Sequence, residues 1–263
     1  MKAKLILLVI FAFGYLSGFN QSREGVAKAE NSVLGQWVRI GQTGPVRFNF
    51  KENGIIEGDF GNDKTIDIVS EYKIINDTII FQDKEGVMCP ENGSYTVYMN
   101  DYYLALDLVD DNCNGRIKTT MGFWTRPNFN ELRKELDNKI SNSPNTDMYL
   151  NRARLYMAIG NSQKARSDFD IYLESNTTNS RVYINRAGTR FPDDMEGVVL
   201  DCNKAIDIDA GNKNAYFLRG LALYQLGEKK QACEDFSKAI ELGFSILRIA
   251  EQEKCIEFWK EEK

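Results

Sequence analysis

Arginine and aspartate side chains recur together in the C-terminal half of this chain of 263 residues. The recurring residues are Arg152, Arg186 and Arg219, followed after a similar interval by Asp168, Asp201 and Asp235. One interpretation is a ladder of guanidinium groups that binds an acidic ligand, and the other is a set of ion pairs between packed helices. We favour the structural interpretation, because both partners return in every copy and a ligand site rarely repeats with the period of its scaffold.

The chain contains no histidine. This excludes the Ser-His-Asp and Cys-His nucleophile systems and most zinc and iron sites. Carboxylate, lysine or tyrosine chemistry is still available, but no spacing in the chain brings two acids together in the way that a carboxylate hydrolase needs. We therefore expect a protein that is not an enzyme and uses no cofactor.

One loop has half of the pattern of a calcium site. Residues 110–115 read Asp-Asp-Asn-Cys-Asn-Gly, but the position that requires a bidentate glutamate holds Met121. We expect a polar hairpin turn that carries a disulfide-bonded cysteine, and no metal site.

The N-terminus has the pattern of an export signal. Lys2 and Lys4 precede an apolar run from Leu5 to Phe13, which is too short for an ordinary membrane-spanning helix. We expect residues 1–29 to be a signal peptide and a linker, with an uncleaved N-terminal membrane anchor as the alternative. The expected location is the periplasm or the outside of a bacterial cell.

The five cysteines of an exported chain predict disulfide bonds with one thiol left over. Cys89 and Cys113 share the N-terminal half, whereas Cys233 and Cys255 lie near the C-terminus. Locality favours pairing within each group, although the sequence alone leaves the connectivity open. Cys202 stands where the other repeats have phenylalanine, so we expect a buried free thiol there.

Residues 33–127 alternate apolar and polar side chains, and Asn-Gly and Asn-Asp pairs separate the alternating runs. Such pairs are typical of tight hairpin turns. The predicted strands cover residues 35–40, 46–50, 55–60, 66–75, 78–82, 95–100, 102–108 and 116–124. A series of short strands without intervening helices predicts an antiparallel barrel or a compact sandwich.

The two ends of this region resemble a lipocalin-like barrel. A Gly-x-Trp motif ends at Trp37, and an arginine, Arg126, follows the last predicted strand. The resemblance implies that Trp37 plugs the floor of the barrel and that Arg126 covers it. A small apolar ligand inside the barrel is one hypothesis. We favour a barrel filled by its own aromatic side chains, because small barrels are usually packed solid.

Residues 128–145 are expected to form a bridging helix and a linker. Phe129, Leu132, Leu136 and Ile140 recur at helical spacing, and Pro144 prevents the helix from continuing. We expect this helix to pack on the first of the repeats that follow it.

From residue 146 a phrase returns with a period of about 34 residues. Tyr-Leu-Asn-Arg-Ala at 149–153 returns as Tyr-Ile-Asn-Arg-Ala at 183–187, and more loosely as Tyr-Phe-Leu-Arg-Gly at 216–220. The pattern of small residues at Ala153, Ala187 and Gly220 resembles the tetratricopeptide repeat family over residues 146–243. The resemblance implies three stacked helical hairpins, followed by a capping helix over residues 245–260 within a domain that extends to residue 263.

The concave face of such a stack is the candidate binding surface. Its side chains come from the first helix of each repeat and differ between copies. The candidate partner-binding residues are Asn151, Arg154, Arg181, Asn185, Asn214, Phe217, Leu221 and Tyr224. The asparagines are suited to a peptide backbone, and the apolar residues of the third copy are suited to an apolar side chain. The alternative is that the bridging helix covers part of this face.

These patterns predict an α+β protein with two domains: an antiparallel β barrel or compact sandwich, and an all-α solenoid of three repeats with a C-terminal cap. The net charge of -5 and the lack of a cationic cluster exclude nucleic acid as a partner. We expect an exported adaptor that binds a protein or a peptide. The alternative function is a carrier of a small hydrophobic ligand. In that case the barrel binds the ligand, and the repeats only dock the barrel.

Overall fold

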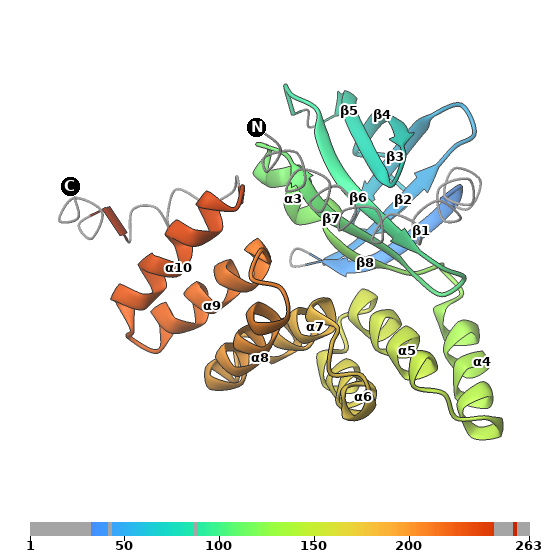
Figure 1. The fold of residues 1–263 in the computed structure, drawn as a ribbon. Helices are drawn as coiled ribbons and strands as arrows, with labels where there is room; N and C mark the ends of the chain where they lie inside the picture. The colour runs from blue at the N-terminus through green and yellow to red at the C-terminus, as the bar shows by residue number, and fades with distance from the viewer. Residues whose placement is uncertain (1–32, 42–43, 87–88, 245–254, 257–263) are drawn as a thin grey trace, which may run out of the picture.

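The computed structural model describes residues 33–41, 44–86, 89–244 and 255–256. The predicted signal peptide at 1–29 and nearly all of the predicted capping helix lie outside the described residues. Within the described part, a β barrel precedes an array of helices (Figure 1). No helix of this part is long and apolar enough to cross a membrane.

The sheet has eight strands, and each strand pairs in antiparallel fashion with the next one along the chain. The strands are β1 (Gly35–Gly41), β2 (Gly44–Phe50), β3 (Ile55–Phe60), β4 (Ile68–Ile75), β5 (Thr78–Gly86), β6 (Gly93–Met99), β7 (Leu104–Asp110) and β8 (Gly122–Trp124). Val38 and Thr125 exchange two backbone hydrogen bonds of 2.8 and 2.9 Å, which join β1 to the end of β8. The sheet thus curls into the predicted barrel.

The alternating pattern of the strands determines which side chains fill the barrel. In β2, for example, Val46, Phe48 and Phe50 point inward and are almost fully buried. Trp37 of β1, Tyr95 of β6 and Trp124 of β8 complete the aromatic part of this core. Because successive side chains of a strand point to opposite faces, the polar residues between them lie on the outside.

The predicted strand over residues 116–124 is wrong for most of its length. Residues Asn114–Thr120 form a short helix, α3, and only Gly122–Trp124 belong to the sheet. The predicted hairpin turn at Asn114 and Gly115 is instead the first turn of this helix. The helix prevails because it buries Ile117 and directs the guanidinium of Arg116 toward two buried carboxylates, contacts that a local alternation pattern does not reveal.

The helical part begins with α4 (Phe129–Asn142), the predicted bridging helix. Six helices then form three hairpins: α5 (Thr146–Ala158) with α6 (Ser162–Ser175), α7 (Ser180–Arg190) with α8 (Met195–Ile208), and α9 (Lys213–Gln225) with α10 (Lys229–Glu241). Asparagine or aspartate side chains accept backbone N–H groups at the start of four of these helices: Asn145, Asn161, Asp194 and Asn212.

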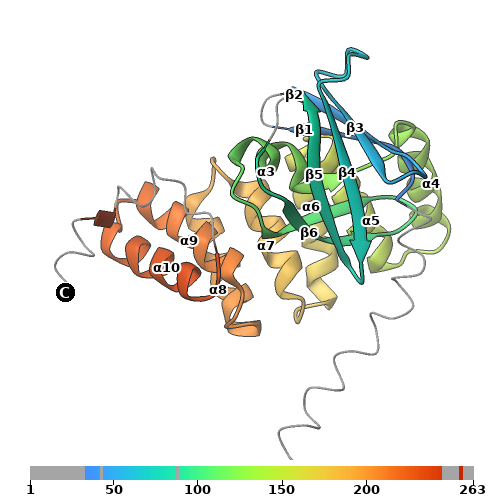
Figure 2. The same ribbon diagram turned by 90° about the horizontal axis from the view of Figure 1, so that it is seen from above.

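The barrel lies against the first helices of the array, while α9 and α10 extend away from it (Figure 2). Helix α5 contacts β8 and β1 directly. Gly160, after α5, lies close enough to Ile40 that a Cβ atom there would be 3.4 Å from the isoleucine side chain. The two parts of the chain are therefore packed together, and this packing decides which side chains of the repeats face solvent.

Candidate functional site

The recurring arginines form ion pairs inside the helical array. Arg152 donates to both carboxylate oxygens of Asp168 over 2.8 and 2.7 Å, and Arg219 donates to those of Asp235 over 2.7 and 2.6 Å. Arg186 pairs in the same way with Asp201. The three aspartates are buried, so these bidentate pairs link the two helices of each hairpin, as the structural interpretation predicts.

Each of these arginines also reaches the preceding helix of the array. Arg152 binds Asp137 of α4 over 2.7 Å, and at the same distance Arg186 binds Asp170 of α6 and Arg219 binds Asn203 of α8. Helix α4 thus takes the place that α6 and α8 occupy for the later repeats. Leu136 of α4 is fully buried, as expected for a helix stacked on the first repeat. The array is therefore three hairpins with an additional half repeat at its N-terminal end.

The barrel occupies the first part of the predicted concave face. Asn100 donates a hydrogen bond of 2.8 Å to Asn151, and Arg154 donates to the phenol oxygen of Tyr103 while its guanidinium lies 4.8 Å from the centre of that ring. Arg181 lies 2.6 Å from the Asp107 carboxylate. These contacts use three of the eight candidate residues. Their role toward another chain stays a prediction, and it would require the barrel to leave this face.

The second repeat has a buried hydrogen-bond donor without an acceptor among the described residues. The amide nitrogen of Asn185 is buried and has no hydrogen-bond partner within the described part of the chain. Neighbouring Gly188 is exposed, and a Cβ atom added to it would meet nothing within 4 Å. The second repeat therefore has one buried amide nitrogen that no described residue accepts from, and open space at Gly188 on the same helix.

The third repeat contains the remaining candidates. Asn214 is exposed, whereas Phe217, Leu221 and Tyr224 are half-buried. The ring of Phe217 lies 6.0 Å from that of Phe236 and stacks on Phe244 at 4.4 Å between ring centres. Phe217 thus serves partly as core. Leu221 and Tyr224 also pack partly against the cluster around Cys233 and Phe236. Together with Asn214 they belong to α9, which extends away from the barrel (Figure 2).

The predicted plug and cover of the barrel, Trp37 and Arg126, contact each other. Trp37 is buried, and its indole N–H donates to the Val33 carbonyl over 2.7 Å. The Arg126 guanidinium lies 3.7 Å from the centre of the Trp37 ring and donates to the Leu34 carbonyl over 2.8 Å. The arginine therefore covers the face of the tryptophan ring. That this pair plugs a lipocalin-like barrel stays a prediction.

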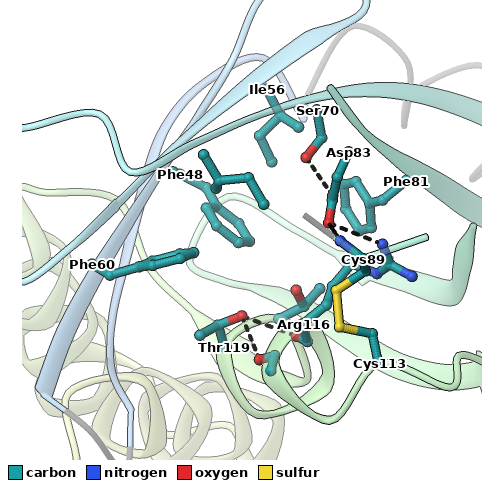
Figure 3. A pocket seen from close by; sticks show the side chains of 14 residues that line it. Phe48, Ile56, Phe60, Ser70, Phe81, Asp83, Cys89, Cys113, Arg116 and Thr119 are labelled. Carbon is teal, nitrogen blue, oxygen red and sulfur yellow. Dashed lines mark hydrogen bonds and ion pairs between the residues drawn. A yellow bond between two sulfur atoms is a disulfide. The ribbon is translucent and has the colours of Figure 1, made fainter. Parts of the chain in front are cut away.

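The barrel and helix α3 enclose a cavity of about 420 Å³ (Figure 3). Our expectation of a completely filled barrel is therefore wrong. Phe48, Ile56, Phe60, Ile68 and Phe81 form most of its wall, and helix α3 with the Cys89–Cys113 bridge closes another side. The two tryptophans of the core, Trp37 and Trp124, do not line this cavity, and Trp124 stacks behind the Phe48 ring at 4.5 Å between ring centres.

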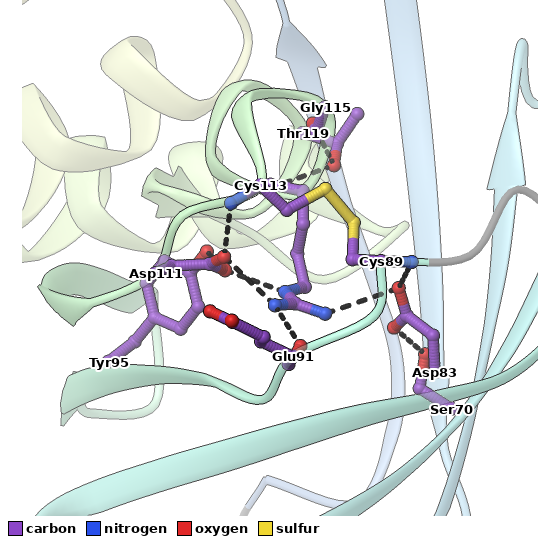
Figure 4. The surroundings of a disulfide bond; sticks show 10 residues. Ser70, Asp83, Cys89, Glu91, Tyr95, Asp111, Cys113, Gly115 and Thr119 are labelled. Carbon is purple, nitrogen blue, oxygen red and sulfur yellow. Dashed lines mark hydrogen bonds and ion pairs between the residues drawn. A yellow bond between two sulfur atoms is a disulfide. The ribbon is translucent and has the colours of Figure 1, made fainter. Parts of the chain in front are cut away.

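A buried ionic cluster borders this cavity (Figure 4). Arg116 of α3 donates to Asp111 from Nε over 2.6 Å and from Nη2 over 2.8 Å, and it donates to Asp83 from Nη1 over 3.2 Å. Tyr95 donates to Asp111 over 2.6 Å. Burial, and then this hydrogen bond, raises the pKa of Tyr95 well above its usual value.

Sequence reasoning missed this cluster because it assigned residues 110–115 to a polar hairpin turn with a disulfide-bonded cysteine. In the structure Asp111 accepts hydrogen bonds from Arg116 and from the backbone of Cys113, so its oxygens serve an ionic cluster. Gly93 is the residue that makes room, since a Cβ atom there would lie 2.1 Å from an Asp111 oxygen. No group of acidic or cysteine side chains in the described ranges could hold a metal ion.

The cysteines form disulfides within each of the two groups that lie close together in the sequence, as expected. One disulfide joins Cys89 to Cys113 and the other joins Cys233 to Cys255, whereas Cys202 is free and buried. The second bridge ties the described residues 255–256 to helix α10. The Cys202 thiol is surrounded by apolar side chains, and this burial raises its pKa to about 12.

Residues 214–243, which form the third hairpin, match the model of the tetratricopeptide repeat family. The third hairpin is thus a tetratricopeptide repeat, and the helical part of this chain is an array of the tetratricopeptide-repeat type. A curated relative, the mitochondrial import receptor subunit TOM70 of Homo sapiens, is 26% identical over 138 residues, which is 51% of this chain and 22% of the relative. The match thus spans about a fifth of that relative's length.

Solved structures also resemble the chain. The crystal structure of MamA covers 58% of this chain and 93% of its own, with 17% identity and a TM-score of 0.46. The second tetratricopeptide repeat domain of human RPAP3, solved with an HSP70 peptide, covers 40% of this chain and 90% of its own. That domain has 23% identity and a TM-score of 0.38.

Proposed function

We propose that this protein is a protein-interaction adaptor and that its tetratricopeptide repeats bind a protein or peptide partner. The observation that carries the proposal is the division of the concave face. The barrel engages Asn151, Arg154 and Arg181, while Asn214 and Leu221 of the third repeat lie beyond it. The part of the face beyond the barrel combines an exposed amide with apolar surface, which suits an extended peptide.

We further propose that the adaptor is exported and is not an enzyme. Two disulfides within one chain support an oxidising compartment, where such bonds persist. The lack of histidine, together with arginines that are committed to ion pairs, supports a role in binding over a role in catalysis. Recovery of the mature protein from the periplasmic or extracellular fraction of its own cells tests the location, and recovery from the cytosol would contradict it.

The adaptor proposal is tested with a displayed peptide library. A sequence enriched on the wild-type protein is synthesised and titrated against Leu221→Glu, which places a charge on the third repeat. Leu200→Glu on α8 is the control for the added charge, because Leu200 is 66% exposed. Circular dichroism of Leu221→Glu checks that it still folds, because Leu221 packs partly against the core of the third hairpin. We expect at least a tenfold loss of affinity for Leu221→Glu and none for the control. Equal binding by both variants would contradict the proposed surface.

A second candidate function is a carrier of a small hydrophobic ligand, and the cavity in the barrel favours it. Its volume of about 420 Å³ falls within the usual range for small-molecule sites, about 300–1,000 Å³. Native mass spectrometry of the protein purified from its own cells tests this candidate. An added mass of a few hundred daltons, roughly the size of a drug-like ligand, would support the carrier. A protein without added mass, which also fails to bind small amphiphiles, would contradict it.

A further inference from the structure

The cavity of the barrel has one polar wall, and that wall carries excess negative charge. Asp83 and Arg116 both line the cavity, and Asp111 lies directly behind Arg116. One guanidinium therefore balances only one of two carboxylates. The exposed fraction is 5% for the Arg116 side chain and 0% for both aspartate side chains, so solvent screens this excess charge poorly.

Arg116 is already occupied by protein acceptors. Its Nε and Nη2 atoms bind Asp111, Nη1 binds Asp83, and Nη2 also donates to the Glu91 carbonyl over 2.7 Å. A ligand with an anionic head would have to displace one of these partners and would then lie near two buried carboxylates. Leaving a buried carboxylate without its partner is costly, so the wall disfavours anionic ligands.

The remaining wall of the cavity is rich in aromatic rings. Phe48, Phe60 and Phe81 line it together with Ile56 and Ile68 (Figure 3). The face of a phenyl ring carries partial negative charge and attracts a nearby cation, most strongly where water is excluded. The same rings also bury the apolar part of a ligand. Both the ionic wall and the aromatic wall therefore favour a positive charge on an apolar body.

We propose that the barrel cavity binds a small hydrophobic cation, an amine with an apolar body. Its ammonium group lies beside the carboxylate of Asp83, which also accepts hydrogen bonds from the Ser70 hydroxyl and the Cys89 N–H. Its apolar body lies among the phenylalanine rings. This inference rests on the carrier function of the barrel and names the class of ligand that the cavity selects. Helix α3, fixed by the Cys89–Cys113 bridge, closes the site from one side.

The test compares three probes with the same alkyl chain and different heads: octylammonium, octanol and octanoate. Their affinities for the full-length mature protein are measured at neutral pH by isothermal titration calorimetry. We expect octylammonium to bind at least tenfold more tightly than octanoate, with octanol between them. Equal or tighter binding of octanoate overturns the proposed cation but leaves a carrier standing. Binding of none of the three overturns the carrier function as well.

Substitutions in the ionic wall and in the aromatic wall test whether each wall contributes to the preference for a cationic ligand. Asp83→Asn keeps the size of the side chain and removes the excess charge, so we expect octylammonium to lose at least fivefold in affinity while octanol changes little. Asp110→Asn is the matched control, because Asp110 is exposed and does not line the cavity. If Asp83→Asn does not fold, Phe60→Leu gives a second test, in which octylammonium should weaken relative to octanol. An unchanged ratio between the two probes would overturn the proposal.

Discussion

The guanidinium of Arg181 lies 2.6 Å from the carboxylate of Asp107 and 3.5 Å from the centre of the Tyr98 ring. Arg181 belongs to α7 of the second helical hairpin, whereas Asp107 and Tyr98 belong to neighbouring strands of the barrel. One side chain thus joins the two parts of the chain through an ion pair and an aromatic contact. The repeats, which are proposed to bind another protein, already bind the chain's own barrel.

The Arg181–Asp107 pair should contribute a small but measurable free energy to stability. The two side chains are 26% and 37% exposed, so solvent screens the pair, and a coupling energy of about 0.5–1 kcal/mol is expected. A double-mutant cycle with Arg181→Ala and Asp107→Ala, measured by urea unfolding, determines it. The exposed pair Lys238–Glu241 of α10 is the control, with coupling close to zero. Coupling no larger than that of the control would show that the junction does not depend on this pair.

Gly220 should be intolerant of a methyl group, and Gly188 should accept one. A Cβ atom at Gly220 would lie 2.7 Å from the Phe236 ring, so Gly220→Ala should lower the free energy of unfolding by about 1–3 kcal/mol. Gly188→Ala, in a helix with nothing within 4 Å, should raise it by about 0.5–1 kcal/mol. Chemical denaturation of both variants measures the difference. Unchanged stability of Gly220→Ala would contradict the close packing between α9 and α10, and a loss of stability in Gly188→Ala would contradict the open space beside α7.

The two disulfides should contribute similarly to stability. They close loops with sequence separations of 24 and 22 residues, so chain entropy predicts about 3 kcal/mol from each bridge. Serine replacement of both cysteines in one bridge, followed by guanidinium unfolding, measures the contribution of that bridge. Replacing Cys89 and Cys113 should destabilise the barrel, and replacing Cys233 and Cys255 should destabilise the last repeat. Unchanged stability of either double variant would show that its bridge does not constrain the unfolded chain.

The thiol of Cys202 should be inert in the native protein. Burial raises its pKa to about 12, so the reactive thiolate is scarce at pH 8, and apolar neighbours exclude reagents. Thiol labelling followed by mass spectrometry should detect modification only after urea unfolding under non-reducing conditions. A native protein that is labelled within minutes at pH 8 would be inconsistent with this buried position. Cys202→Ala should remove the labelling in urea, which confirms the site.

Much of the fold was predictable because the sequence patterns that specify its helices and strands lie within short segments of the chain. The phrase around Tyr149 to Ala153 recurs along the chain, and each copy forms the first helix of a hairpin. The alternating strands were predicted for the same reason, since the side-chain period of a strand is visible in a few residues. Local reasoning failed at residues 116–120, where an alternating segment forms a helix because Arg116 reaches buried acids elsewhere in the barrel.

The sequence by itself determined the elements of this protein: the antiparallel strands, the three helical hairpins, and the Arg–Asp pairs that recur with them. Only the tertiary structure decided that Arg154 and Arg181 face the barrel, and that a cavity remains between Phe48 and Arg116. The physical reason is the range of the interactions. Backbone periodicity and helix packing depend on near neighbours in the chain, whereas a shared surface and an unfilled volume depend on side chains that only the complete fold brings together.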